Sequence, residues 1–543
     1  MAYPFKEFIP KSFLCFKEGY SWKYFFNDLF AGASVGVIAL PLALAFAIAS
    51  GVPPEKGLFT AIIAGFLISL LGGSRIQIGG PTGAYVVLVY AVMQKHGYDG
   101  LALATLTAGF MIFLMGIARF GVLLKFIPHP VIIGFTTGIA VVILSSQVKD
   151  FFGLQIDKVP PEFLEKCKLF CATAHTGSFW AIFVAVITLT FIFVLRRYFP
   201  KWPGVITAVI LATLATYLFQ LPLTTIDSKF GEIPRVLPSP ALPHFSWELF
   251  TTVFPDAVTI ALLGAVESLL CAVVADGMTG YKHKSNCELA AQGLANIGSV
   301  IFGGIPATGA IARTTANIRL GAKTPVAGMI HAGTLLLLML FFAPYAGKIP
   351  LAALSSVLVF VAWNMSELPH FFEILKGQKG DAAVLLVTFL LTVLIDLAVA
   401  VQVGVIFGAL IFLKRMTDKT VVEISKKDHV IILEMKGPLF YSVANLLEEA
   451  TLDRNAKVCI LSFSKTPWMD ASGIHALKKF SIKNQQKGIT LLLSDVNSHQ
   501  IHVLQKSGLE TLIGKENIFH TTDSALSHAN TNKDLAFLQR DSI

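Results

Sequence analysis

The stretch GGPTGAY occupies residues 79–85, and a second stretch of similar character, GGIPATGAI, occupies residues 303–311. Each interrupts a region that is otherwise apolar enough to cross a membrane as helices. Non-helical backbone at membrane depth is tolerated only where protein or a water-filled cavity satisfies its polar groups. One break falls in each half of the apolar region, so we predict that the two breaks form the two sides of one binding site.

The composition places most of the chain in a lipid bilayer. Of its 543 residues, 54% are hydrophobic and only 14% are charged, whereas soluble domains carry about 25% charged residues. The net charge of +9 comes from basic residues in short loops between apolar runs and not from one basic stripe. This pattern indicates membrane topology and speaks against nucleic acid as a partner.

Twelve apolar runs are candidates to cross about 30 Å of hydrocarbon, and two shorter segments, 82–94 and 308–319, follow the breaks. The short segments are third and tenth of the fourteen, so each is third in its half of seven. Because seven is odd, the second half enters with the opposite orientation, which is typical of an inverted repeat. The twelve runs are 28–50, 57–73, 100–121, 126–147, 178–198, 203–221, 254–275, 288–303, 326–344, 350–363, 380–395 and 397–414.

The basic residues predict the orientation of the chain. With the N-terminus inside, lysines and arginines gather in or beside the cytoplasmic loops, while the external loops hold a mixture of charges. We therefore expect a multi-pass protein of the cytoplasmic (inner) membrane with both termini in the cytoplasm. The residues on which this rests are Arg75, Arg119, Lys125, Arg196, Arg197, Lys201, Lys282, Lys284, Arg319, Lys323, Lys376 and Lys379.

The chemistry of the two breaks suits an anion. A helix that starts inside the membrane leaves its first N–H groups unpaired and carries roughly half a positive charge at that end. Two such starts facing each other would form an anion-binding cradle. Gly83 and Gly309 would allow close backbone approach, and Thr82 and Thr308 would add hydroxyl donors. The alternative is that the breaks are ordinary kinks that ease helix packing.

Two ionisable residues lie in apolar surroundings near these breaks. Glu267 falls within the run LLGAVESLLCAVVAD, and Arg313 follows Gly309 by four residues, which places it about one turn inside the second short helix. Ionisable groups inside the membrane are expensive and usually functional. Arg313 would attract an anion, and a proton or a sodium ion on Glu267 would remove the carboxylate charge that opposes it. The alternative is a structural ion pair between Glu267 and Arg313.

Four stretches together resemble the sulfate permease (SulP) family. They are NDLFAGASVGVIALPLALAFAIASGVPPEKGLFTAIIAGF, IQIGGPTGAY, PHPVIIGFTTGIAVVI and ADGMTGYKHKSNCELAAQGLANIGSVIFGGIPATGAIARTTANI. The resemblance implies an α-helical polytopic fold of 14 spans as a 7+7 inverted repeat, like that of uracil transporters. It also implies a core domain and a gate domain that move against each other, and a homodimer.

The resemblance assigns roles to particular residues. Glu267 matches the carboxylate of the eighth span that many prokaryotic members use for coupling, and Arg313 matches a basic position of the tenth span. Two residues depart from the family pattern. Leu42 stands where many members carry glutamine, which removes one polar group from the site. Cys271 stands where some sodium-coupled members carry a hydroxyl group, and this difference favours a proton over sodium as the coupling ion. The substrate positions implied are Thr82, Gly83, Ala84, Thr308, Gly309 and Ala310, together with Arg313.

From about residue 420 the pattern changes to short β-rich runs that alternate with helical stretches such as 443–453 and 473–486. This predicts a small cytoplasmic α/β domain, and GPLFYSVAN and WMDASGIHAL resemble the STAS domain. Ser472 in MDASG matches a serine that is phosphorylated in related anti-sigma-factor antagonists, so this domain would bind a cytoplasmic partner. The alternative is that Ser472 caps the helix that begins near Gly473.

These observations predict a domain order and a function. We expect a cytoplasmic segment at 1–25, a transmembrane domain at 26–415, a STAS domain at 420–528 and a polar, loosely held tail at 529–543. The chain would be a transporter of a small inorganic or carboxylate anion and not an enzyme, without cofactor or metal site, coupled to H+ or Na+.

Other readings of the function stay open at this point. Sulfate is favoured by family, while bicarbonate and C4-dicarboxylates are alternatives. The chain could also be an anion exchanger, a channel, or a membrane-anchored anion sensor that signals through its STAS domain. Cys167 and Cys171 fall in a loop predicted to be external, where a disulfide is an option.

Overall fold

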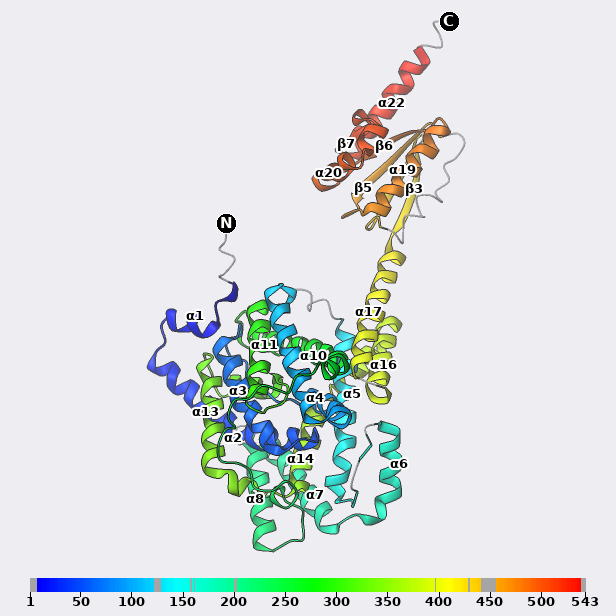
Figure 1. Cartoon of the computed structure of the whole chain (residues 1–543). Helices are drawn as coiled ribbons and strands as arrows, with labels where there is room; N and C mark the ends of the chain where they lie inside the picture. Colours follow the sequence, from blue (N-terminus) through cyan, green and yellow to red (C-terminus); the bar gives the residue numbers. More distant parts are fainter. Residues whose placement is uncertain are drawn as a thin grey trace. The chain divides into compact units, whose positions relative to one another are not determined.

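The structure, a computed structural model, describes residues 7–121, 128–156, 159–160, 162–199, 203–395, 397–427, 430–440 and 456–538. Contacts divide the chain into two compact units, Met1–Gly408 and Ala409–Ile543. The boundary falls inside α17 (Leu397–Lys419). The first unit is almost entirely helical, and the second contains a β-sheet with helices on its faces (Figure 1).

One group of helices in the first unit, here called the core bundle, carries both sequence breaks. Within it, α11 packs on α3 and α4, α10 packs on α4, and α13 packs on α2 and α3. Two-residue strands, β1 (Gly79–Gly80) and β2 (Thr308–Gly309), precede α4 and α12. The core bundle consists of α2 (Trp22–Ala49), α3 (Pro54–Leu71), α4 (Gly83–Ile117), α10 (Trp247–Thr279), α11 (Ser285–Ile301), α12 (Ile311–Arg319) and α13 (Val326–Ala346).

A second bundle in the same unit is built around α5. Helices α14 and α16 pack on α5, α7 packs on α14, and α8 packs on α7 (Figure 1). Its members are α5 (His129–Phe152), α7 (Phe179–Tyr198), α8 (Gly204–Leu218), α14 (Leu351–Met365) and α16 (Lys379–Leu394). Shorter helices in the connections are α1 (Lys11–Lys17), α6 (Phe163–Thr173), η3 (Ala174–Thr176), α9 (Ile226–Phe230) and α15 (Leu368–Lys376).

Local signals in the sequence fix several helix ends. Ser21, Ser178 and Ser246 precede α2, α7 and α10, and each side chain accepts a hydrogen bond from a backbone N–H in the first turn. Such a bond satisfies one of the donors that a helix start leaves unpaired. At the other end, Gly153 closes α5 with φ of 64°, a left-handed conformation that glycine adopts without strain.

The predicted apolar segments correspond to helices, with differences at their borders. The segments predicted at 82–94 and 100–121 correspond to the two parts of α4, which are separated by a kink at Gly97, where φ is 66°. The segment predicted at 308–319 starts later, because Thr308 and Gly309 form a strand and α12 begins at Ile311. By length and composition, nine helical stretches in the described part of the chain could each cross a bilayer. The total of fourteen spans stays a prediction.

The second unit contains a five-stranded sheet in the order β3-β4-β5-β6-β7. Strands β3 and β4 pair antiparallel, and the remaining neighbours pair parallel. Parallel pairing requires helical crossovers, which cover the faces of the sheet. The strands are β3 (Val421–Lys427), β4 (Val430–Lys436), β5 (Val458–Lys465), β6 (Thr490–Ser494) and β7 (Ile518–Phe519).

Both faces of the sheet are buried along β4, β5 and β6, whereas β3 is mostly exposed. Successive side chains along a strand point to opposite faces. Leu433 and Leu461 belong to the core on one face, with α19 (Ala471–Gln486), whereas Ile432 and Ile460 face α22 (Thr522–Leu538). Helices α20 (Ser498–Lys506) and α21 (Leu509–Ile513) and the short η4 (Lys515–Asn517) complete the unit.

The tail predicted at 529–543 begins inside α22, which extends to Leu538 and buries Ala529 against the sheet. Residues 539–543 lie outside the described residues. The helix predicted at 443–453 lies outside the described residues.

Candidate functional site

The two sequence breaks meet inside the core bundle. Strands β1 and β2 pair antiparallel, with Gly79 opposite Gly309. The N–H of Ala310 also donates to the carbonyl oxygen of Ile78 over 2.8 Å. These bonds satisfy backbone groups that a helix break would otherwise leave exposed to hydrocarbon. Segments that are far apart in the sequence therefore lie side by side.

A helix begins at each side of this crossing. Helix α4 starts at Gly83 after Thr82, and α12 starts at Ile311 after Ala310. Neither Thr82 nor Ala310 makes a capping side-chain bond to the helix that follows it. Both helix starts therefore present backbone N–H groups and the positive end of the helix dipole, an arrangement that favours a negative charge.

The start of α4 faces the second bundle. A Cβ atom at Gly83 would lie 2.8 Å from Met365 Sδ in α14 and 3.2 Å from Ile143 Cδ1 in α5. At the other helix start, a Cβ atom at Gly309 would lie 2.1 Å from Gln77 Nε2. Glycine at both positions thus permits a close approach that a larger residue would prevent.

Glu267 lies beside the start of α4. It is half-buried in the middle of α10, and its Oε2 accepts a hydrogen bond from Thr82 Oγ1 over 3.3 Å. The structure describes both Glu267 and Arg313, and the two side chains form no ion pair with each other. The alternative of a structural Glu–Arg pair therefore does not hold in this structure.

Arg313 lies in the first turn of α12, earlier in the helix than predicted, because α12 begins at Ile311 and not near Gly309. Only 3% of its surface is exposed. Its Nη2 donates to the carbonyl oxygen of Pro81 over 2.8 Å, and its buried Nη1 has no hydrogen-bond partner among the described residues. The guanidinium group thus lies against the backbone that leads into α4.

The threonine hydroxyls at the crossing already donate hydrogen bonds within the protein. Thr308 Oγ1 donates to the carbonyl oxygen of Gly264 over 3.1 Å, and Thr82 donates to Glu267. Ala84 is fully buried. A ligand at the crossing would therefore meet backbone N–H groups first, and the predicted hydroxyl donors would have to change partner to contact it.

A row of polar side chains on α11 supports the crossing, and the sequence analysis missed it. Asn296 both donates to the carbonyl oxygen of Ala307 over 3.0 Å and accepts from its N–H over 2.8 Å. At the start of α11, Glu288 Oε2 accepts from the N–H groups of Gly73 and Ser74. The signal was present, because polar residues recur every three or four positions on one helix face. These residues are Glu288, Gln292, Asn296 and Ser299.

Family comparison agrees with this arrangement. Residues 25–388 match the sulfate permease family, and residues 421–525 match the STAS domain. The chain belongs to the sulfate permease family. Because this family consists of transporters, the protein is a multi-pass integral membrane transporter of anions and not an enzyme.

Relatives in this family cover nearly the full length of the chain. The putative sulfate transporter YvdB of Bacillus subtilis is 41% identical over 520 residues, which are 93% of this chain and 98% of that protein. The bicarbonate transporter BicA of Picosynechococcus is 30% identical over 83% of this chain and 85% of its own length.

Solved structures agree on the fold. The murine anion transporter Slc26a9 in its inward-facing state superposes with a TM-score of 0.88 at 19% identity, covering 96% of this chain and 94% of that one. The transmembrane domain of BicA gives a TM-score of 0.63 at 29% identity, covering 72% of this chain and 98% of that one. The predicted fold, a helical membrane unit followed by a STAS domain with a β-sheet, is confirmed.

Both departures from the sulfate permease pattern are buried in the core bundle. Leu42 lies in the last third of α2. Cys271 is fully buried in α10 and its Sγ donates to Thr314 Oγ1 over 3.2 Å, while Thr314 Oγ1 also accepts from the N–H of Ile78. Cys271 therefore contacts α12 and helps to hold the crossing together.

In the STAS domain, Ser472 is not the helix cap. Helix α19 begins at Ala471, and the side chain of Asp470 accepts a hydrogen bond from the N–H of Gly473 over 2.8 Å. The proposal that Ser472 caps this helix was wrong by two residues, because the aspartate provides the acceptor. Ser472 is exposed in the first turn of α19.

Metal and disulfide chemistry find no support in the described residues. Among them, no group of three or more histidine, cysteine, aspartate or glutamate side chains is placed to hold a metal ion. Cys167 and Cys171 lie in α6 as free thiols. The groups that could bind a ligand at the crossing are thus backbone N–H groups, one carboxylate and one guanidinium.

Proposed function

We propose that the protein is a secondary active transporter that moves a small anion across the cytoplasmic membrane by alternating access. The anion would bind at the starts of α4 and α12, near Thr82, Gly83, Ala84, Thr308, Gly309, Ala310 and Arg313. The observation that carries this proposal is the antiparallel pairing of β1 and β2, which brings two uncapped helix starts to one point. Each start contributes about 0.3–1 kcal/mol toward binding a negative charge, and more where it is partly buried.

The place of the site supports a moving transporter over a fixed pore. The start of α4 lies where the core bundle meets the second bundle, as the contacts of Gly83 with Met365 and Ile143 illustrate. A displacement of one bundle against the other would open a site at their boundary to one side of the membrane and then to the other. The two bundles would therefore act as the core and gate domains of the family.

Sulfate is the substrate that we propose. The support is the 41% identity to a putative sulfate transporter, set against 30% to a bicarbonate transporter. A cradle of backbone N–H groups accepts any small oxyanion, so the chemistry of the crossing also admits bicarbonate and a C4-dicarboxylate. Uptake of sulfate, bicarbonate and a C4-dicarboxylate by the same preparation would distinguish these substrates.

Glu267 is proposed to carry the coupling ion, either H+ or Na+. Its carboxylate lies beside the proposed anion site through the contact with Thr82 and has no arginine partner among the described residues. An ionised carboxylate opposes anion binding, and neutralisation by a proton or a cation removes that opposition. Anion and coupling ion would then bind together.

The decisive test is uptake into proteoliposomes. Sulfate, bicarbonate and fumarate are each offered without a gradient, with an inward proton gradient and with an inward sodium gradient. One gradient should stimulate uptake of one anion, and Glu267→Gln should lose that stimulation while anion exchange remains. Glu248→Gln, an exposed carboxylate on the same helix α10, is the matched control and should behave as wild type.

Two results would overturn parts of this proposal. Gradient stimulation that survives in Glu267→Gln would remove the coupling role of that residue. Folded protein that transports none of the three anions would favour an anion sensor acting through the STAS domain.

We also propose a homodimer with both termini in the cytoplasm. A mass measurement in nanodiscs would check the dimer, and protease access to the STAS domain would check the orientation.

A further inference from the structure

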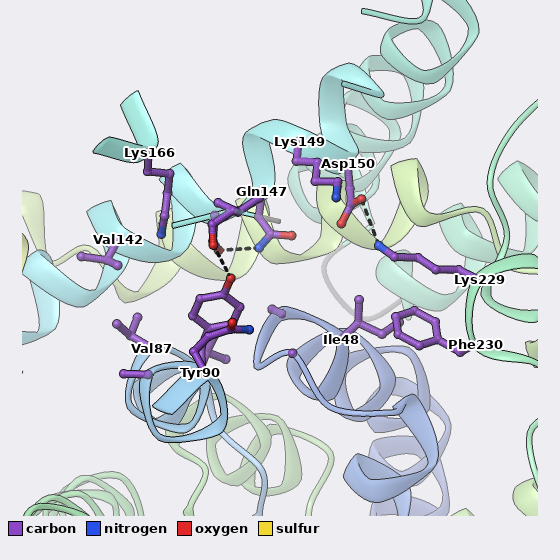
Figure 2. Close-up of a pocket in the computed structure, with 17 residues that line it drawn as sticks. Ile48, Val87, Tyr90, Val142, Gln147, Lys149, Asp150, Lys166, Lys229 and Phe230 are labelled. Atoms are coloured by element: carbon purple, nitrogen blue, oxygen red, sulfur yellow. Dashed lines mark hydrogen bonds and ion pairs between the residues drawn. The ribbon is translucent and has the colours of Figure 1, made fainter. Parts of the chain in front are cut away.

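A cavity with a volume of about 260 Å³ lies away from the crossing, between α4, α5, α6 and the end of α2 (Figure 2). None of the residues proposed for the helix-start site lines it. Its nearest approach along α4 is Val86, three residues after Gly83, and it extends to Tyr90 and Gln94. With a rise of 1.5 Å per residue, Tyr90 lies about 10 Å along the helix from Gly83.

The charged residues that line the cavity are predominantly basic. Among the residues that the structure describes, three lysines and one aspartate contribute to its wall. Lys229 Nζ lies 3.7 Å from Asp150 Oδ1, and Lys149 Nζ donates to the carbonyl oxygen of Ile156. The aspartate thus compensates one of the lysines, and the described part of the wall carries more positive than negative charge.

Lys166 differs from Lys149 and Lys229 in its burial and in the surroundings of its ammonium group. It comes from α6 and is only 4% exposed. Within the described part of the chain, no hydrogen bond or ion pair engages its ammonium group. Figure 2 shows the side chain with its nitrogen at the end nearer Tyr90, so the ammonium group points into the cavity.

The other polar groups of the wall do not neutralise this charge. Tyr90 donates its hydroxyl proton to the carbonyl oxygen of Val159 over 2.7 Å, and Gln147 Nε2 donates to Ser146 Oγ over 2.7 Å. Both side chains are therefore held in place by neighbours. They leave a fixed, polar surface around the ammonium group of Lys166.

A buried ammonium group without a counter-ion is unfavourable unless a ligand compensates it. Burial lowers the pKa of Lys166, and its neighbour Cys167 acts in the opposite direction. An anion beside the ammonium group would favour the charged form and raise the pKa again. The volume is also many times the roughly 30 Å³ that one water molecule occupies in the liquid, so an oxyanion fits together with part of its hydration shell.

We propose that this cavity is a second anion-binding site, anchored by Lys166, for a small inorganic oxyanion such as sulfate. It is separate from the site at the helix starts and lies on the α6 side of the core bundle. An anion held here would be about two helical turns from the start of α4, close enough to pass to or from the first site. The binding itself does not depend on the proposed coupling through Glu267.

Equilibrium binding of radioactive sulfate to full-length protein in nanodiscs tests this proposal. Lys166→Met removes the charge and keeps a flexible apolar chain, and it should bind one sulfate fewer per chain than wild type. Lys168→Met, an exposed lysine on the same helix, should bind as many sulfates as wild type. Lys166→Arg retains the positive charge and should therefore bind as many sulfates per chain as wild type.

A second variant keeps the proposal testable if Lys166→Met fails to fold. Val142→Glu places a carboxylate in the wall of the same cavity, where its negative charge would oppose an anion, so it should also bind one sulfate fewer per chain. Equal sulfate binding by wild type, Lys166→Met and Val142→Glu overturns the second site, as does wild-type protein that binds no sulfate. The number of bound sulfates reports on this cavity whether or not the anion is transported.

Discussion

Arg313 carries a positive charge deep into the core bundle, and among the described residues no carboxylate forms an ion pair with it. Its Nη2 is satisfied by the carbonyl oxygen of Pro81, but a carbonyl group offers only a partial negative charge. A buried cation in that position costs several kcal/mol unless an opposite charge approaches. A bound anion at the adjacent helix starts would supply it, which explains why a residue so costly to bury is compatible with this fold.

In the STAS sheet, the side chain of Asp495 is held by hydrogen bonds from three neighbouring residues. It lies at the end of β6, and its Oδ2 accepts hydrogen bonds from Ser462, Ser494 and Thr522, over 2.8, 3.0 and 2.6 Å. Burial would raise the pKa of this carboxyl, but the three hydroxyl donors outweigh burial and hold the pKa below its usual range. The charged carboxylate thus joins β5, β6 and the start of α22.

This arrangement predicts how the stability of the STAS domain changes with pH. Because the folded-state pKa of Asp495 is depressed, its contribution is fully present above the unfolded pKa of about 3.9 and disappears as pH falls through the folded value. Asp495→Asn tolerates the same positive φ of 58° and should lower the free energy of unfolding by about 1 kcal/mol at pH 7.

Urea denaturation of residues 420–543, at pH values from 7 down to 3, measures this effect. The difference between wild type and Asp495→Asn should be largest at pH 7 and should shrink as the aspartate of the wild type becomes protonated. A difference that stays constant over the whole range would show that the carboxylate charge is not the cause.

At the residue scale, the sequence indicated some of the candidate site residues but not others. Glu267 and Gly309 were detectable because a carboxylate or a glycine-rich break is conspicuous inside an apolar run. Lys166 was not, since its burial depends on how α6 covers the ends of α4 and α5, which are distant in sequence. The misassigned role of Ser472 shows a further limit, because serine and aspartate are equally good caps and only geometry selects Asp470.

Among the elements, the contact between α4 and α11 holds the core bundle most closely together. A Cβ atom at Gly293 in α11 would lie 2.4 Å from the backbone nitrogen of Phe113 and 2.5 Å from the carbonyl oxygen of Gly109 in α4. Small residues let helix backbones approach closely in membranes, where packing supplies much of the attraction. This contact holds the part of α4 that follows Gly97 against α11.

Gly293→Ala should therefore separate the two helices. We expect it to destabilise the protein by about 1–3 kcal/mol, the usual range for an added group in a packed core, although alanine favours helix more than glycine does. Gly333→Ala on α13 is the control, because a Cβ atom there meets nothing within 4 Å. Thermal unfolding in detergent should show a lower Tm for Gly293→Ala and an unchanged or higher Tm for Gly333→Ala.

The outline of the elements followed from hydropathy, but their junctions did not. Apolar runs of about 20 residues marked the long helices, since such runs have one stable structure in lipid. The pairing of β1 with β2 could not be derived from either stretch alone, because it depends on two breaks that meet in space. The prediction placed the border of the STAS domain at residue 528, inside α22, because the sequence beyond it is mostly polar, and the packing of Ala529 on the sheet depends on the fold.

At the scale of the whole molecule, the residues of the proposed anion sites and those of the STAS domain belong to different units. All residues of both proposed anion sites belong to Met1–Gly408, whereas Ser472 and Asp495 belong to Ala409–Ile543. Each unit has its own hydrophobic core. Substrate choice should therefore be a property of the first unit alone.

Removal of the STAS domain tests this division of labour. A protease site inserted after Lys419, where α17 ends, allows residues 420–543 to be cut off after reconstitution, so that insertion into the membrane is not affected. We expect the transport rate or the thermal stability to change, while sulfate, bicarbonate and fumarate keep the same order in competition assays. The uncut protein in the same preparation is the control. A changed order of preference after cleavage would mean that the STAS domain takes part in selecting the anion, and the helix starts of α4 and α12 would then not be sufficient to define the substrate.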